Sequence, residues 1–406
     1  MRRKAEYAHD TAPSWVIGVQ RVADKFYCQI CEADHLEILD AYADIPRVTS
    51  DCKPWPAGGK ISVCHACGAV QKIPDADWFD DINRIYGGYQ IYDLSAGAEQ
   101  VIFNSAGEAA PRSRLLVEFV RSNVSLAREG RLIDLGCGNG AALESFSKAL
   151  PDWKLYGSEL SETALPFLNS LPNFVQLFTA EPRDIGGTYD LVSMIHSLEH
   201  MPYPGKTLAE ALRLLSDDGV FFVEIPDVET SPFDLIVADH LGHFSRATLR
   251  YLFERNGFSV QVVRNDLLPK ENTLLARRGS VDAKLSDAAQ GIFLAKRNVA
   301  WLHMVIDRAR QAASRSLQFG IFGTSISGTW LFGALREDIA FFVDEDKTRV
   351  GQKLEGRPII SPSEVPKGAD VFVPLIPSVA EKVFARLAPY GIRFVAPPPF
   401  IPAPSQ

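Results

Sequence analysis

Short apolar runs of strand length alternate with longer segments of mixed polarity through the middle of this chain. Four of these runs cover residues 132–135, 153–157, 189–195 and 220–226. Longer stretches of mixed polarity that predict helices cover 111–128, 141–150 and 245–256. Because strands alternate with helices, the pattern predicts an α/β fold built on a Rossmann-like sheet.

The first apolar run ends in a turn with three alternate glycines, Gly136, Gly138 and Gly140. Glycine lacks a Cβ, so it permits a tight turn and lets bare backbone approach a ligand. The third glycine comes one residue earlier than in a dinucleotide fingerprint, and Asp134 precedes the first. An acid beside the loop repels phosphate and suits a cationic amino-acid moiety. The turn therefore predicts a nucleoside-bearing cofactor that is not a dinucleotide.

This loop resembles that of class I S-adenosylmethionine-dependent methyltransferases, and the order of the following strands agrees. In that family an acid after the second strand binds both ribose hydroxyls, and Glu159 occupies that place. The resemblance implies S-adenosylmethionine as cofactor. The candidate cofactor-binding residues are Asp134, Gly136, Cys137, Gly138, Gly140, Glu159 and His196. We interpret Cys137 as a small filler of the loop rather than a nucleophile.

Composition and charge fit a multidomain enzyme with a small substrate. The chain has 406 residues, enough for two or three cores, and 46% of them are hydrophobic. No apolar stretch reaches the roughly 18 residues that a membrane span needs. The start, Met-Arg-Arg-Lys, lacks the apolar run of a secretory signal, so we expect a cytoplasmic protein. The net charge of −8 argues against a nucleic-acid partner.

Four of the six cysteines form two C-x-x-C pairs, Cys28 with Cys31 and Cys64 with Cys67. Two such pairs can hold one tetrahedral zinc ion, so we predict a structural zinc site. A disulfide would need an oxidising compartment, and a redox pair would need a thioredoxin-like context. Other possible ligands are His35, Cys52 and His65, which we interpret as surface or loop residues.

The last part of the chain begins with a predicted helix, 298–316, and continues with a second strand–glycine–helix pattern at 318–328. An apolar run that ends in Asp344 follows about twenty residues later. The pattern predicts a Rossmann-like domain, which either binds nucleotide or sugar or serves as a structural lid or oligomerisation surface. We expect three units: a zinc module with a tyrosine segment (1–100), a cofactor domain (101–277) and this C-terminal domain (278–406).

In this order the units resemble the three-domain sugar C-methyltransferases that act on nucleotide-linked keto-deoxysugars. The sharpest stretch is 233–245, where the family typically reads Phe-Asp-x-Ile-Tyr-His-Glu-His-x-Ser-Tyr-Phe-Ser. His240 matches the histidine regarded as the catalytic base, and Asp239 replaces the glutamate before it. Val237, Ala238 and His243 replace a tyrosine, a histidine and another tyrosine. These departures leave the identity of the substrate open.

Histidine suits this place because its pKa lies near neutrality, so it can remove a proton from carbon or from a hydroxyl. The alternative is a structural histidine that caps the helix predicted at 245–256. A second group follows the third apolar run, where a helix would put His196, Glu199 and His200 on one face. The resemblance assigns His200 to the acceptor, with Asp239 as a further helper of His240.

Three more residues are expected at the substrate. Tyr89 and Tyr92 match tyrosines that close over the substrate in the family, and His243 lies beside the proposed base. An aromatic plug between domains is the alternative for the two tyrosines, and a packing role is the alternative for His243. We expect a monomer or homodimer.

The sequence therefore predicts a methyltransferase that methylates a carbon of a nucleotide-linked keto-deoxysugar. O-methylation of a sugar hydroxyl or another small metabolite is the alternative. A non-catalytic nucleotide- or sugar-binding protein is the second alternative.

Overall fold

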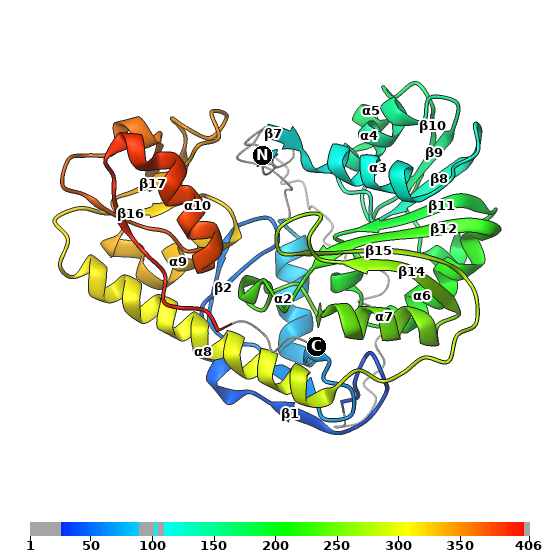
Figure 1. The fold of residues 1–406 in the computed structure, drawn as a ribbon, viewed down its shortest axis with the longest axis horizontal. Coiled ribbons are helices and arrows are strands. Elements are labelled where there is room, and N and C mark those ends of the chain that lie inside the picture. The colour runs from blue at the N-terminus through cyan, green and yellow to red at the C-terminus, as the bar shows by residue number, and fades with distance from the viewer. Residues whose placement is uncertain (1–25, 89–100, 104–108, 402–406) are drawn as a thin grey trace, which may run out of the picture.

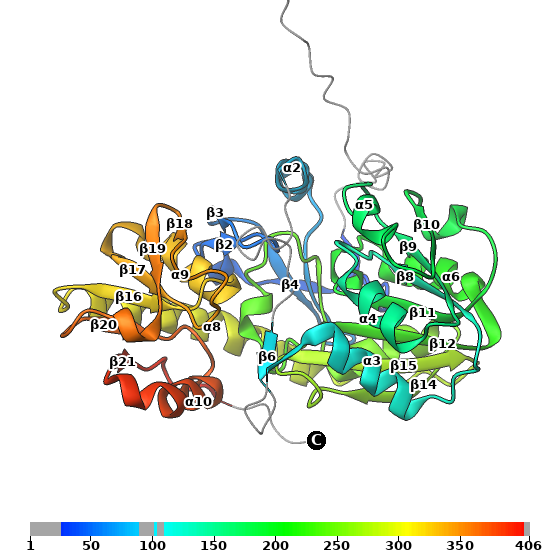
Figure 2. The same cartoon turned by 90° about the horizontal axis from the view of Figure 1, so that it is seen from above.

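Three units lie side by side along the long axis of the molecule (Figure 1). This computed structural model describes residues 26–88, 101–103 and 109–401. The N-terminal module lies between the middle domain and the C-terminal domain, and the view from above agrees (Figure 2). Tyr89 and Tyr92 fall outside the described residues, so their contact with the substrate stays a prediction. The expected domain boundaries also stay predictions.

The N-terminal module is built on a four-stranded antiparallel sheet with the order β1-β4-β5-β13. Its elements are β1 (Leu36–Ile38), η1 (Asp40–Tyr42), β2 (Arg47–Val48), β3 (Pro54–Trp55), β4 (Ile61–Cys64), β5 (Val70–Lys72) and α2 (Ala76–Tyr86). The fourth strand, β13 (Gly242–His243), comes from a much later part of the chain, the motif around the predicted base. Sheet pairing therefore fixes that motif on the N-terminal module.

The middle domain contains a seven-stranded sheet with the order β10-β9-β8-β11-β12-β15-β14, in which β15 runs antiparallel to its neighbours. Its strands are β8 (Arg131–Leu135), β9 (Lys154–Ser158), β10 (Phe174–Phe178), β11 (Tyr189–Ile195), β12 (Leu215–Pro226), β14 (Phe258–Arg264) and β15 (Glu271–Arg278). The parallel strands confirm the predicted Rossmann-like sheet. A hairpin of β6 (Val101–Phe103) and β7 (Ala109–Pro111) precedes it.

Helices cover both faces of this sheet because each strand presents alternate apolar side chains to opposite sides. One face packs against α3 (Arg112–Asn123) and α4 (Ala141–Ala149). The other packs against α6 (Pro204–Leu214) and α7 (Arg246–Arg255). The short helices are α5 (Leu165–Leu168), η3 (Pro182–Asp184), η4 (Leu198–His200) and η5 (Pro232–Asp234). The helix predicted at 111–128 ends earlier, at Asn123, and residues 124–130 connect it to β8.

The C-terminal domain has a six-stranded sheet with the order β18-β19-β17-β16-β20-β21. Its strands are β16 (Phe319–Phe322), β17 (Phe341–Val343), β18 (Lys353–Leu354), β19 (Arg357–Ile360), β20 (Asp370–Phe372) and β21 (Arg393–Val395). Its helices are α8 (Ala288–Ala313), α9 (Ile326–Leu335), η6 (Arg336–Asp338), η7 (Pro362–Glu364), α10 (Pro377–Leu387) and η8 (Ala388–Tyr390). All pairings except β18 with β19 are parallel, as the predicted Rossmann-like fold requires.

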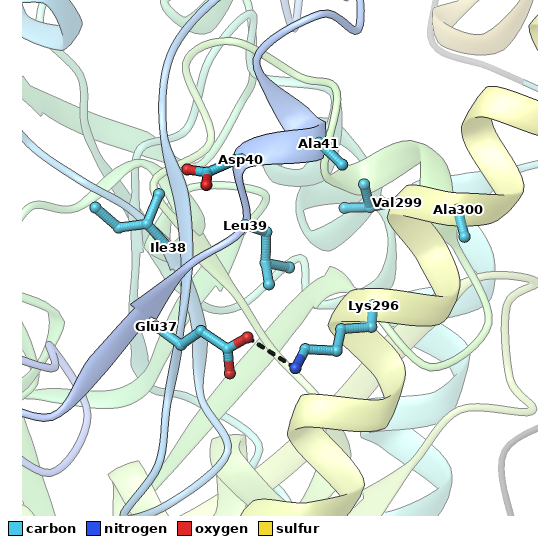
Figure 3. A pocket seen from close by; sticks show the side chains of 8 residues that line it. All are labelled: Glu37, Ile38, Leu39, Asp40, Ala41, Lys296, Val299 and Ala300. Carbon is cyan, nitrogen blue, oxygen red and sulfur yellow. Dashed lines mark ion pairs between the residues drawn. The ribbon is translucent and has the colours of Figure 1, made fainter.

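The long helix α8 joins the three units. It starts ten residues before the predicted start at 298, because the Asp287 side chain caps it there. Inside this added part, Gly291 packs directly on the cysteine turn. A Cβ at Gly291 would lie 1.9 Å from the carbonyl oxygen of Gly68. Further along α8, Lys296 pairs with Glu37 at 2.7 Å beside a surface pocket (Figure 3). Within the described ranges, no helix is both long enough and apolar enough to cross a membrane.

Candidate functional site

The glycine turn follows β8 at the carboxyl edge of the middle sheet, where ligands bind in open α/β folds. Gly136, Gly138 and Gly140 all have left-handed backbone angles, with φ of 80°, 54° and 87°. At Gly136 a Cβ would also lie 2.5 Å from the Ser197 Cβ, so the turn requires glycine twice over. Cys137 is buried inside the turn, as expected for a filler.

Two acids line this turn. Asp134 is buried and accepts a 2.7 Å hydrogen bond from the Ser193 hydroxyl. Burial, with the nearby charge of Glu159, raises the pKa of Asp134 to about 7. Glu159 binds the turn itself, since its Oε2 accepts a 2.8 Å hydrogen bond from the Gly138 amide. Both predicted cofactor acids therefore lie at the glycine turn, and they come from adjacent strands.

The turn after β11 carries the second predicted group. Residues 198–200 form only a single 3-10 turn, so the expected helical face is wrong. His196 instead adopts a left-handed backbone with φ of 51°, and its Nδ1 lies 3.1 Å from Glu199 Oε1. His200 Nδ1 lies 3.0 Å from the Asp239 carbonyl oxygen and 3.2 Å from the Tyr86 hydroxyl. Burial lowers the pKa of His200, which favours a neutral ring.

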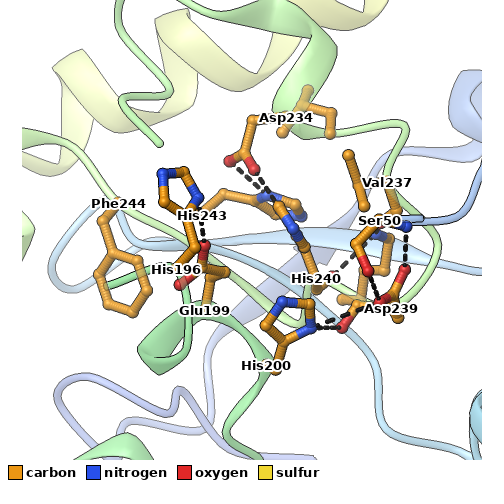
Figure 4. Close-up of polar contacts among 12 residues, drawn as sticks. Ser50, His196, Glu199, His200, Asp234, Val237, Asp239, His240, His243 and Phe244 are labelled. Atoms are coloured by element: carbon orange, nitrogen blue, oxygen red, sulfur yellow. Dashed lines mark hydrogen bonds and ion pairs between the residues drawn. The ribbon is translucent and has the colours of Figure 1, made fainter. Parts of the chain in front are cut away.

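The predicted base, His240, is buried and shares one carboxylate with His243 (Figure 4). Asp234 Oδ1 lies 2.7 Å from His240 Nδ1, and its Oδ2 lies 2.7 Å from His243 Nδ1. A carboxylate only accepts hydrogen bonds, so both Nδ1 atoms carry hydrogen. The Nε2 of a neutral His240 is then free to take a proton. Burial opposes charge on His240, but the hydrogen bond and charge of Asp234 outweigh it and raise its pKa.

His240 does not cap the helix that follows, because Ser245 caps α7. Its ring meets that of His200 edge to face, with centroids 4.7 Å apart. One ligand atom each of Glu199, His200 and His240 lies within 4.8 Å of the others. The structure thus brings together the two histidine motifs that the sequence separates by forty residues, with Glu199 of the first motif close to both histidines.

The N-terminal module holds this motif through groups that the sequence did not identify. Asp239 Oδ1 accepts a 2.9 Å hydrogen bond from the Ser50 amide. The fully buried Lys72 donates to the carbonyl oxygens of Val237 and His240, and burial lowers its pKa to about 7. The sequence gives one hint of the role of Lys72, which is a lysine between the apolar residues Val70 and Ile73. Val237 and Ala238, which replace polar residues of the resembling family, are both buried.

One predicted substrate residue, His243, differs in its surroundings from a substrate contact. His243 lies in β13, is 2% exposed and contacts Asp234 through Nδ1, which agrees with the alternative of a packing role. Asp234 was missed as a site residue, although it belongs to the quoted motif. The sequence hint that could have identified Asp234 is an acidic residue between the apolar residues Phe233 and Leu235.

The four paired cysteines form one cluster apart from the histidines. The four Sγ atoms all lie within 4.8 Å of one another. The Sγ atoms of Cys28 and Cys67 are 3.6 Å apart, as are those of Cys31 and Cys64. All six cysteines are free thiols, so the disulfide alternative is absent from the part of the chain that the structure describes. Sulfurs around a tetrahedral zinc lie about 3.8 Å apart, so the cluster is compatible with zinc.

The possible competing ligands lie outside the four-cysteine cluster. His65 Nε2 lies 2.8 Å from Glu37 Oε2, and the His35 ring stacks on His65. Cys52 is in a separate turn, where burial raises the pKa of its thiol to about 12. Their interpretation as loop residues agrees with the described contacts.

Residues 109–263 match the family model described as a methyltransferase domain. C-methyltransferase NovU of Streptomyces niveus is 27% identical over 178 residues, 41% of this chain and 42% of that protein. A ubiquinone biosynthesis O-methyltransferase of Nitrosococcus oceani is 30% identical over 27% of this chain and 48% of that protein. The chain therefore spans less than half the length of these curated relatives.

Among solved structures, an S-adenosylmethionine-dependent methyltransferase from Aquifex aeolicus is 18% identical, with a TM-score of 0.34. That match covers 41% of this chain and 91% of the other. The family match covers the glycine turn, the two acids predicted to bind the cofactor and both histidine motifs, which lie at one edge of the parallel sheet. Residues 109–263 of this chain are therefore a class I S-adenosylmethionine-dependent methyltransferase domain.

Proposed function

We propose that the protein methylates a carbon of a nucleotide-linked keto-deoxysugar. The observation that carries this proposal is the buried pair of His240 and Asp234, 2.7 Å apart, at the same sheet edge as the glycine turn. A base with a free Nε2 suits proton removal from the carbon beside a ketone. The matched region of the NovU relative, named a C-methyltransferase, supports the reaction class.

The residues at the glycine turn fit S-adenosylmethionine. Gly136, Cys137, Gly138 and Gly140 would offer bare backbone to it, while Asp134 and Glu159 would bind its polar groups; His196 would border it from β11. This cofactor supplies an activated methyl group. The protein must then position a nucleophilic carbon in line with that group and exclude water.

His240 removes the acceptor proton through Nε2, while Asp234 fixes the tautomer and stabilises the charged ring. Asp239 and His200 border this base. His200 donates its Nδ1 hydrogen to the Asp239 carbonyl, so its Nε2 remains an acceptor, and its ring contacts that of His240. Tyr89 and Tyr92 are the proposed substrate contacts, whereas the buried His243 supports Asp234. The acceptor is a small molecule, and we propose a cytoplasmic monomer or homodimer with no nucleic-acid partner.

O-methylation is the second candidate, and two observations favour it. The Nitrosococcus relative, named an O-methyltransferase, is 30% identical over the matched part. Val237 and Ala238 also place apolar, buried side chains where the keto-sugar enzymes carry tyrosine and histidine. The same His240 could take a hydroxyl proton, so the two reactions differ in the atom that receives the methyl group.

We also propose that the four-cysteine cluster holds one structural zinc ion. The paired sulfur distances support it, as do amide hydrogen bonds from Ile30 and Ala66 to Cys28 and Cys64 sulfur. Three of the cysteines belong to the hydrophobic core that also contains one face of the middle sheet. Zinc would therefore stabilise the N-terminal module that holds the histidine motif.

The zinc proposal predicts about one zinc ion per purified chain by elemental mass spectrometry. Cys64→Ser should lose the ion and lower the thermal unfolding midpoint, because one of the four thiolate ligands disappears. Cys52→Ser is the matched control and should keep the ion. A normally folded, metal-free wild-type protein would contradict the proposal.

His240→Ala should lower turnover of nucleotide-linked 4-keto-deoxysugars by about 10²- to 10⁴-fold, because the proton acceptor is lost. Binding of S-adenosylmethionine, measured by calorimetry, should stay within error of wild type. The matched control is His303→Ala on α8, where the imidazole Nε2 lies 2.7 Å from the Ala41 carbonyl oxygen, away from both histidine motifs. Full activity of the His240 variant would remove this residue from the mechanism.

The pH profile provides a separate test of Asp234. Because Asp234 raises the His240 pKa, wild-type kcat/KM should fall as the pH drops through a value above the ordinary 6.5. In Asp234→Asn the charge is lost and burial dominates, so this acidic limb should move to lower pH, with a lower plateau. Asp217→Asn, a fully exposed control, should keep the wild-type limb. An unshifted limb in Asp234→Asn would disprove the pairing.

A further inference from the structure

Every methyl transfer from a sulfonium to a carbon or a hydroxyl group releases one proton. The methyl group replaces a hydrogen of the acceptor, the sulfonium becomes a neutral thioether, and the proposed base, His240, takes the proton at Nε2. The base must lose this proton before the next turnover. The His240 side chain is only 8% exposed, so direct loss to bulk water is restricted. The site therefore needs a route by which the proton reaches solvent.

A row of titratable side chains leads from the base toward the surface. One ligand atom each of Glu199 and His240 lies within 4.8 Å of the other, a gap that one water molecule can bridge. Glu199 Oε1 lies 3.1 Å from His196 Nδ1 (Figure 4). His196 Nε2 lies 3.3 Å from Glu271 Oε2. The Glu199 side chain is 1% exposed, whereas those of His196 and Glu271 are 26% and 17% exposed, so the row ends at solvent.

Glu199 is suited to receive a proton. Its side chain is buried, and neither carboxylate oxygen has a hydrogen-bond partner, so it can accept a proton without breaking an existing bond. An ionised carboxylate without a partner is costly to bury. Burial accordingly raises the pKa of Glu199, which brings it closer to that of His240. Proton exchange between the two groups is easier when their pKa values are close.

His196 is suited to pass a proton on, because each of its ring nitrogens faces a different carboxylate. Burial lowers the pKa of His196 to about 3, so the ring is neutral and carries one hydrogen. Nδ1 can take a proton from one side while Nε2 releases its hydrogen to the other, and the ring stays neutral before and after. The left-handed backbone, with φ of 51°, is uncommon outside glycine and holds the ring between the two acids.

The other polar neighbours of the base lead inward. Asp234 Oδ2 is bound to His243, whose side chain is 0% exposed. The Asp239 side chain is also 0% exposed. His200 is the remaining neighbour, and its Nδ1 lies 3.2 Å from the Tyr86 hydroxyl. A route through these two rings is therefore the competing one, and the test must include it.

We propose that Glu199, His196 and Glu271 form a proton path that carries the proton from the base to solvent while the product is still bound. This inference rests on the proposed role of His240 as base, and it holds for methyl transfer to carbon or to oxygen. The proton passes from His240 Nε2 to a Glu199 oxygen and then to His196 Nδ1. His196 Nε2 releases its hydrogen to Glu271, which gives it to water, and rotation of the ring by half a turn restores the starting tautomer.

The test measures methylated product and released protons in the same reaction, with enzyme in excess over a nucleotide-linked 4-keto-deoxysugar. Product is followed by rapid quench, and protons by a pH-indicator dye in weak buffer, above the acidic limb of the wild-type pH profile. In wild type, product and protons should appear together, one proton for each methyl group. In Glu199→Gln the amide cannot carry the proton, so protons should lag behind product and kcat should fall by about 10- to 100-fold.

Added imidazole is a mobile proton acceptor, so it should shorten the lag in Glu199→Gln, which a merely structural defect would not allow. Glu271→Gln, at a partly exposed side chain, provides the same readout if Glu199→Gln fails to fold. Glu229→Gln is the matched control, because Glu229 is also buried but pairs with Arg246 outside the path. Its protons should appear with product.

Two results would overturn the proton path. One is simultaneous appearance of protons and product in both Glu199→Gln and Glu271→Gln. The other is a lag in Tyr86→Phe alone, which would assign the route to the His200 side.

The outcomes separate this inference from the proposed function. Methyl transfer to carbon without a proton lag in either glutamine variant would overturn only the proton path. A lag in these variants with the methyl group on oxygen would keep the path and overturn C-methylation. Absence of methyl transfer in wild type would overturn the proposed function itself.

Discussion

The site depends on one buried carboxylate that serves two imidazoles. Asp234 accepts hydrogen from the Nδ1 atoms of His240 and His243, and the pairing fixes which nitrogen of each ring carries hydrogen. Because all three groups are buried, neither ring can exchange this contact for water without moving the loop. The proton-accepting nitrogen of His240 is thereby set by packing before any ligand arrives.

This arrangement needs the N-terminal module as much as the methyltransferase domain. Lys72 binds two carbonyl oxygens of the motif, Ser50 binds Asp239, and β13 extends the module's sheet. The cysteine turn in turn packs against α8, through which the C-terminal domain contacts the same core. The proposed cofactor residues belong to the middle domain alone, whereas the proposed base is held at the junction of two units. The site is thus a property of the assembled chain.

Features carried by local pattern could be predicted from the sequence. The strand that ends at Leu135, the glycine turn and the paired cysteines follow rules of spacing, and the family match and the parallel sheet agree on the methyltransferase domain. The contacts of Lys72 could not be predicted, because its partners lie 165 and 168 residues away and only tertiary packing selects them. Asp234 lies in the same motif as its two histidines, but no spacing rule tells which side chains of an irregular loop turn toward one another. Gly291 illustrates the same limit: a glycine that weakens a helix locally is required where α8 meets another backbone.

The most direct test of the central claim is the position of the transferred methyl group. Enzyme, a ¹³C-methyl-labelled cofactor and a nucleotide-linked 4-keto-deoxysugar can be incubated together and the product analysed by carbon NMR before and after acid hydrolysis. C-methylation predicts a labelled methyl bonded to the carbon beside the ketone and a branched sugar that survives hydrolysis. A label bonded to oxygen, with an unchanged carbon skeleton, would contradict C-methylation and establish that the protein is an O-methyltransferase.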